Sequence, residues 1–106
     1  MSTFKNTITQ SIGLTPTTVY TSVGNAIMIG LDIANSNSGA SACTVDVTIT
    51  KGGTTIYYLK AAPLPAGSTL QVIGGQKVVL MNGDILKVTA SAATSADVTC
   101  SILEGV

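Results

Sequence analysis

The sequence predicts a single all-β domain, an antiparallel β-sandwich of about eight short strands. Three observations predict it: short segments rich in Val, Ile and Thr, turn sequences between them at short intervals, and alternation of apolar and polar side chains. The chain has 106 residues, of which 45% are hydrophobic and 9% are charged. That composition suits one domain with a buried core and argues against disorder. A barrel is the alternative that the same strand spacing allows.

The N-terminal residues differ from the rest, so we divide the chain into residues 1–13 and a sandwich domain at residues 14–106. Phe4, Ile8 and Ile12 lie at even positions with mostly polar residues between them, and Pro16 interrupts the pattern. This is typical either of an edge strand or of an arm that adds to the sheet of a neighbouring subunit. Removal of residues 1–9 leaves an isolated fold intact if they form an arm, and unfolds it if they form a strand of the core.

Alternation assigns side chains to the two faces of several predicted strands. In segment 43–50 every second residue is apolar: Cys43, Val45, Val47 and Ile49. Segment 97–104 repeats the pattern with Val98, Cys100 and Ile102. A period of two is typical of a half-buried strand. Segment 26–34 is apolar on both faces, as expected of a central strand, and we expect Ile27, Ile29, Leu31 and Ile33 to share one of them.

A turn sequence, Asn82-Gly83-Asp84, lies between two β-type runs in segment 77–91. Asn-Gly in this setting is the strongest short-range hairpin signal, because Gly adopts the left-handed conformation without a Cβ clash. We therefore expect the flanking strands to form a hairpin. Asp84 is expected to accept a backbone hydrogen bond within the turn, which is a structural role.

The residue types that usually carry catalysis are sparse. The chain has no His, and its five acids are dispersed: Asp32, Asp46, Asp84, Asp97 and Glu104. Asp32 and Asp46 become neighbours only if their strands pair. No motif indicates a metal site or a cofactor, and we expect a protein that is not an enzyme. Cys43 and Cys100 fall on apolar faces and are expected to be thiols in the core, with the distance between them open.

Charge and hydropathy restrict the partners. Five scattered lysines offset the five acids, so the net charge is zero, and binding to a nucleic-acid backbone is not expected. No secretory signal and no apolar run of ~20 residues is present, so no membrane partner is expected. A neutral surface with few charges is a poor basis for a soluble monomer. We expect much of this surface to lie against other copies or a larger assembly.

The order of the segments is itself informative. A threonine-rich entry at residues 14–21 precedes apolar segment 27–34, which ends in an Asn/Ser/Gly loop; segments 43–50, 54–75, 77–91 and 97–104 follow, with a Pro-x-Pro-Ala-Gly connection at residues 63–67. In this order, from about Leu14 onward, the chain resembles small virion structural proteins of tailed bacteriophages. The arrangement Leu-x-x-Gly-Asp-x-Leu-x-Val at residues 80–88 is also similar to strand pairs of jelly-roll proteins.

The resemblance implies a jelly-roll-like β-sandwich that decorates or cements a capsid, or that lies in the neck or tail. It implies other virion proteins as partners, namely the major capsid protein or neck and tail proteins, and a homo-oligomer, with a trimer favoured. The location implied is the virion, assembled in the host cytoplasm. The resemblance carries over no catalytic residue, cofactor or metal.

The candidate contact surface draws on apolar and aromatic side chains of the predicted strands and turns. Its residues are Phe4, Ile8, Ile12, Tyr57, Tyr58, Pro63 and Pro65. The alternative is a fibre or tail component that binds a receptor or glycan, with Tyr57, Tyr58 and the loop 35–41 as its surface. An enzyme or an accessory domain of one is a third class, which the missing His and the dispersed acids disfavour.

Overall fold

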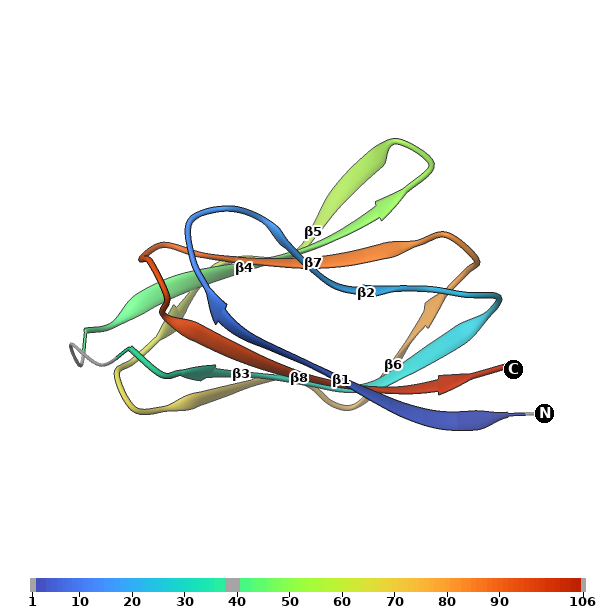
Figure 1. The fold of residues 1–106 in the computed structure, drawn as a ribbon, viewed down its shortest axis with the longest axis horizontal. Helices are drawn as coiled ribbons and strands as arrows, with labels where there is room; N and C mark the ends of the chain where they lie inside the picture. The colour runs from blue at the N-terminus through green and yellow to red at the C-terminus, as the bar shows by residue number, and fades with distance from the viewer. Residues whose placement is uncertain (1, 38–40, 106) are drawn as a thin grey trace.

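In the computed structural model, the described residues form eight strands in two four-stranded antiparallel sheets that pack face to face (Figure 1). The structure describes residues 2–37 and 41–105, and for residues 74–76 the backbone alone. The strands are β1 (Thr3–Ile12), β2 (Thr17–Thr21), β3 (Ala26–Asn35), β4 (Cys43–Lys51), β5 (Thr54–Leu64), β6 (Thr69–Leu80), β7 (Ile85–Ala90) and β8 (Ala96–Glu104). One sheet has the order β1-β8-β3-β6 and the other the order β2-β7-β4-β5. The predicted all-β sandwich is confirmed.

The strand order is that of a jelly roll. The chain is in effect one long hairpin, in which β4 pairs with β5, β3 with β6, β2 with β7 and β1 with β8. Paired residues lie nearly equidistant from the turn at Gly52–Gly53: Lys51 is opposite Thr54, and Thr3 is opposite Glu104. Rolling this ribbon up brings β8 beside β3 and β7 beside β4, which closes the two sheets.

The turn between β4 and β5 connects the one pair of consecutive strands that are neighbours in a sheet of the described chain. Gly52 and Gly53 have φ of +53° and +90°. A two-residue hairpin with positive φ at both central residues matches the right-handed twist of the strands, and glycine adopts it without steric cost. The long ribbon therefore begins at a turn that the sequence specifies locally.

The predicted hairpin at Asn82-Gly83-Asp84 is wrong, because β6 and β7 lie in different sheets. The turn does form, with Gly83 at φ +89°, and Asp84 accepts a 2.9 Å hydrogen bond from the Met81 N–H as expected. It pairs with the β2–β3 connection instead of folding β6 onto β7: Ser22 N donates to the Asp84 carbonyl and Gly83 N to the Ser22 carbonyl. The turn thus carries the chain from one sheet to the other.

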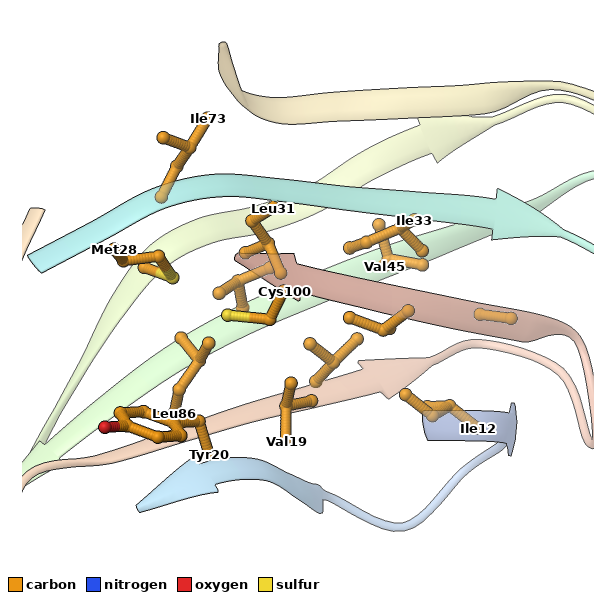
Figure 2. Close-up of a cluster of buried hydrophobic side chains, with 14 of the residues drawn as sticks. Ile12, Val19, Tyr20, Met28, Leu31, Ile33, Val45, Ile73, Leu86 and Cys100 are labelled. Atoms are coloured by element: carbon orange, nitrogen blue, oxygen red, sulfur yellow. The ribbon is translucent and has the colours of Figure 1, made fainter. Parts of the chain in front are cut away.

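The core lies between the sheets and is built from the inward side chains of both (Figure 2). The alternation predicted for β4 and β8 is confirmed, since Val45, Val47, Cys100 and Ile102 are all buried. β2 contributes the buried Val19 and Tyr20. The other five strands contribute fully buried side chains: Ile12, Met28, Leu31, Ile33, Leu64, Ile73, Leu80, Leu86 and Val88. Burial of apolar area on this scale is the main stabilising contribution to such a domain.

Irregularities in the strand pairing overturn two predictions about the face of the sheet from which side chains project. The register of β3 shifts between Met28 and Gly30, so Ile27 and Ile29 point outward while Leu31 and Ile33 point into the core. A bulge adds a residue to one strand and thereby exchanges the faces of the residues beyond it. The same effect between Thr9 and Ile12 turns Ile12 into the core at 1% exposure. Ile12 is therefore not a contact residue of the surface, as predicted, but part of the core.

Two bulges, the one in β1 and another in β5 where it pairs with β4, are held by a carboxylate from the neighbouring strand. Ser11 has φ +57° and its N–H donates to Asp97 Oδ1 at 2.9 Å; Ala61 has φ +51° and its N–H donates to Asp46 Oδ1 at 2.7 Å. Positive φ is costly for residues with a Cβ. The hydrogen bonds offset that cost, so these acids act in the fold.

Candidate functional site

An apolar row crosses the outer face of the sheet β1-β8-β3-β6. Phe4 on β1 is opposite Leu103 on β8, Leu103 is opposite Ile27 on β3, and Ile27 is opposite Val79 on β6. Directly opposed residues of adjacent strands project from the same face. The alternate residues beside them, Ala26, Leu80 and Ile102, are buried in the core. The four side chains of the apolar row therefore all point outward.

The ends of the apolar row are its most exposed parts. Phe4 is 77% exposed and Val79 is 63% exposed, whereas Ile27 and Leu103 are partly covered by their neighbours. Ile29 extends the row along β3 and, with Phe4 and Asn6, lines a shallow depression. The outward face of a two-layer antiparallel sandwich is ordinarily polar. The apolar row therefore departs from the polar outer face expected of such a sandwich, and it is the candidate site for contact with another molecule.

The candidate contact residues are distributed over separate parts of the molecule. Phe4 and Ile8, the latter 76% exposed, project from the outer face of β1. Tyr57 is 54% exposed on the opposite sheet, and Pro63 and Pro65 are exposed near the end of β5. Tyr58 is partly buried against the core. The structure thus brings Phe4 and Ile8 together on β1, and Pro63 and Pro65 together at the end of β5, but it does not gather the predicted set into one surface.

The outer face of the second sheet is different in character. Tyr57 lines an open groove of about 390 Å³ together with residues of β4, β5 and β7 and of the β1–β2 connection: Leu14, Pro16, Asp46, Thr48, Thr50, Thr55, Lys87 and Thr89. The Lys60 ammonium lies 4.7 Å from the centroid of the Tyr57 ring, a cation–π distance. Hydroxyl and charged groups beside an aromatic ring make this groove chemically suited to a polar ligand.

The loop that was expected to share a ligand surface with Tyr57 belongs to the opposite end of β4. Its first residue, Asn35, is buried, and its amide nitrogen donates to the carbonyls of Ser41 and Leu64 at 2.9 and 3.0 Å. Asn35 therefore fixes the β3–β4 connection against the end of β5. Residues 38–40 of the loop lie outside the described part of the chain.

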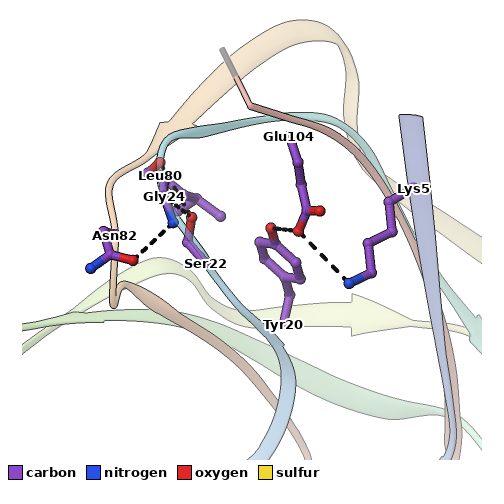
Figure 3. Close-up of polar contacts among 7 residues, drawn as sticks. All are labelled: Lys5, Tyr20, Ser22, Gly24, Leu80, Asn82 and Glu104. Carbon is purple, nitrogen blue, oxygen red and sulfur yellow. Dashed lines mark hydrogen bonds and ion pairs between the residues drawn. The ribbon is translucent and has the colours of Figure 1, made fainter. Parts of the chain in front are cut away.

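A polar cluster joins the two sheets near the chain termini (Figure 3). The Tyr20 hydroxyl donates a 2.5 Å hydrogen bond to Glu104 Oε2, and the Lys5 ammonium lies 3.7 Å from the same oxygen. Burial raises the pKa of Tyr20 to about 12, with the Glu104 hydrogen bond and charge adding to the effect and contacts to Ser22 and Val23 opposing it. Tyr20 is thus held neutral at ordinary pH.

The acids do not converge on a site. Asp32 lies on β3 and Asp46 on β4, in different sheets, so the two are not paired neighbours. Asp84 is buried and contacts the Lys51 ammonium at 3.3 Å. Within residues 2–37 and 41–105, no group of three or more Cys, Asp or Glu side chains is placed to hold a metal ion. No helix long and apolar enough to cross a membrane occurs in that part of the chain.

Both cysteines are free and buried, in different sheets. Burial raises the pKa of the Cys100 thiol to about 11, and the neighbouring Thr7 side chain acts in the opposite direction. Within the described residues the buried Thr7 hydroxyl has no hydrogen-bond partner. Burial also raises the pKa of the Cys43 thiol. Both groups therefore behave as core side chains.

Neither a protein-family model nor a curated protein matches this chain. The apolar row itself was missed in the sequence because Ile27 and Ile29 were expected to share a face with Leu31 and Ile33, which are buried in the core. The available signal was the run Ala26–Leu31, in which both faces are apolar although only one can face the core of a two-layer sandwich.

Proposed function

We propose that this protein is a structural protein of a bacteriophage virion, and most specifically a capsid decoration or cement protein. It acts by binding neighbouring molecules, and it performs no catalytic step. A position in the neck or tail is the alternative within the same proposal. The partners are other virion proteins, and the protein is part of the virion after assembly in the host cytoplasm.

The apolar row from Phe4 through Leu103 and Ile27 to Val79 carries the proposal. It extends over all four strands of one sheet, so a flat partner surface can cover it without any rearrangement of the fold. The jelly-roll strand order adds support, because this fold is common among capsid domains, although it also occurs in lectins and enzymes. The resemblance of the segment order to small virion proteins points in the same direction.

Burial of the apolar row favours association at this face. Burial of apolar area contributes roughly 25 cal/mol per Å², from which the cost of immobilising the partners is subtracted. The low net charge removes long-range repulsion between copies crowded on a shell. Many weak contacts of this kind, repeated over a particle, stabilise it without needing a strong single contact. The trimer implied by the resemblance remains a prediction.

The test is attachment to capsids of the phage that encodes the chain. Val79→Lys places a charge at the exposed end of the apolar row and should reduce co-sedimentation with stripped capsids at least about tenfold. Thr18→Lys is the matched control, because Thr18 is an exposed residue of β2 in the other sheet. Failure of the unsubstituted protein to bind any capsid form would contradict the proposal, as would equal binding by the two variants.

A second function, binding of a glycan or other polar receptor, is favoured by the groove around Tyr57. An exposed ring beside Thr48, Asp46 and other polar groups provides the stacking surface and the hydrogen-bonding groups that sugars need. A glycan array distinguishes the two functions. Binding that is lost in Tyr57→Ala and retained in Val79→Lys supports the receptor function, and no binding to any glycan counts against it.

A further inference from the structure

The sandwich has four edge strands, and three of them are interrupted. β2 is only five residues long, follows Pro16 and is bulged between Thr18 and Tyr20. β5 contains Pro63 and the bulge at Ala61, and the pairing of β6 with β3 shifts register twice. Short length, proline and bulges are the features that keep edge strands from pairing with other chains.

β1 lacks these interruptions over most of its length. Thr3 to Thr9 pair with β8 in one unbroken register of seven residues, and the first bulge comes only after Thr9. Among the strands that the structure describes, β8 is the only neighbour of β1 in its sheet. Within the described chain, these seven residues make no backbone hydrogen bond other than those of the strand ladder. Half of their N–H and C=O groups, those directed away from β8, are therefore available to another strand.

We propose that this edge is where two copies of the chain associate, through antiparallel pairing of β1 with β1 of a second copy about a two-fold axis at Asn6. A two-fold axis brings the same edge of both copies together in antiparallel orientation, so the edge is complementary to itself. The pairing therefore requires no strand from a different protein. In this register Phe4 is opposite Ile8 of the second copy, and Ile8 is opposite its Phe4. Apolar pairs directly across antiparallel strands are stabilising.

The charges permit this register. Lys5 is the only charged residue of β1, and it becomes opposite Thr7 of the second copy. Its ammonium already lies beside Glu104 on the inner side of the sheet. On the outer side the Asp97 carboxylate lies near Ile8, and it already accepts a hydrogen bond from the Ser11 N–H. Pairing joins the two sheets into one of eight strands and continues each apolar row toward that of the other copy. We expect about six to eight new backbone hydrogen bonds.

Disulfide trapping of the two-fold axis is the sharpest test. Asn6 and Thr3 are both exposed, and the native cysteines are buried, so the background is low. In the proposed dimer Asn6→Cys places two sulfurs across the axis, with Cα atoms about 4.5–5.5 Å apart, within disulfide range. Thr3→Cys leaves its two copies about 20 Å apart. Mild oxidation should give a covalent dimer with Asn6→Cys and none with Thr3→Cys.

Light scattering of the purified protein gives a second readout, independent of engineered thiols. The contact is small, so we expect association in the micromolar range. Ile8→Lys should raise the dissociation constant at least about tenfold with unchanged far-ultraviolet circular dichroism, whereas Val79→Lys, at the opposite edge of the same face, should leave it unchanged.

The proposal would be overturned if the wild-type protein were monomeric up to millimolar concentration, or if it formed a trimer that Ile8→Lys does not affect. It would also be overturned if Asn6→Cys and Thr3→Cys gave equal amounts of covalent dimer. So would capture of a different protein's strand by β1 in place of a second copy. The experiments use the purified chain alone. A negative capsid-binding result therefore leaves the dimer standing, and a monomeric protein that still binds capsids overturns only the dimer.

Discussion

The hydroxyl of Tyr20 on β2 donates a hydrogen bond of 2.5 Å to Oε2 of Glu104 on β8, and so joins the two sheets of the sandwich at the end where the chain terminates. Lys5 of the edge strand β1 lies 3.7 Å from the same carboxylate oxygen. One carboxylate thus connects β1, β8 and β2. A connection of this kind ties the edge strand to the core and has consequences for stability at high pH.

The Tyr20–Glu104 bond predicts a loss of stability in alkaline solution. Burial and Glu104 raise the pKa of Tyr20 from 10.0 to about 12, so the folded state binds the phenol proton more tightly than the unfolded state does. The corresponding stabilisation, on the order of 2 kcal/mol, is complete below pH 10 and is lost as pH rises toward about 12. The measurement is urea unfolding of wild type and Tyr20→Phe across this range.

Tyr20→Phe should be less stable than wild type by about 1–2 kcal/mol at pH 8, because Glu104 loses a hydrogen bond at a partly buried site. The difference between the two proteins should shrink between pH 10 and 12. A difference that stays constant across this range would show that the Tyr20 pKa is not raised in the fold. Comparing the two proteins cancels the titration of the lysines, which is common to both.

The carboxylates at the bulges should matter for stability and not for binding. Asp97→Ala removes the acceptor of the Ser11 N–H, and we expect a loss of about 1 kcal/mol in the free energy of unfolding. Asp97→Asn keeps an acceptor oxygen and should lose less. Lys77→Ala, which removes a charge at an exposed residue of β6, is the control and should change stability by no more than about 0.5 kcal/mol. Chemical denaturation measures all three.

The alternation of apolar residues was sufficient to predict the sandwich and the facing of β4 and β8. It failed where an extra residue enters a strand, as at Ser11 and between Met28 and Gly30, because a bulge reverses the facing beyond it and leaves no mark in the residue types. Ile12 and Ile27 were misplaced for this reason. Since the apolar row depends on Ile27, its position on the surface became visible only in the structure.

The strand order could not be predicted from the sequence for a different reason. Asn82-Gly83 looks like a hairpin turn, yet its partners are the backbone groups of Ser22, far away in the chain. Local turn chemistry specifies that the chain reverses, and pairing between distant strands decides which sheet it enters. The Gly52–Gly53 turn has the same local chemistry and does form a hairpin. The two sequences alone do not distinguish these outcomes.

Removal of residues 1–9 should unfold or strongly destabilise the domain. β1 covers one side of β8, and its loss uncovers Cys100 and Ile102, which are now fully buried. The lost ladder and burial together amount to about 3 kcal/mol or more. Removal of residues 1–2, which precede β1, is the control and should leave the thermal midpoint unchanged. A truncated protein as stable as the full chain would indicate that β1 is a dispensable arm.

The buried thiols should be unreactive in the folded protein. Cys100 is inaccessible, and its raised pKa of about 11 keeps the thiolate scarce at pH 8. A colourimetric thiol reagent should therefore react with neither cysteine on mixing, and with both after addition of denaturant. Immediate reaction of either thiol in native buffer would contradict the packing of the core. The same experiment establishes the background for trapping at position 6.

The most direct measurement is a density map of the intact phage particle. We expect copies of the protein on the outside of the capsid, or alternatively in the neck or tail, with Phe4, Leu103, Ile27 and Val79 covered by a neighbouring molecule. A particle without the protein would contradict the proposal that this domain functions by binding neighbours within a virion. A particle in which the whole apolar row faces solvent would contradict it equally.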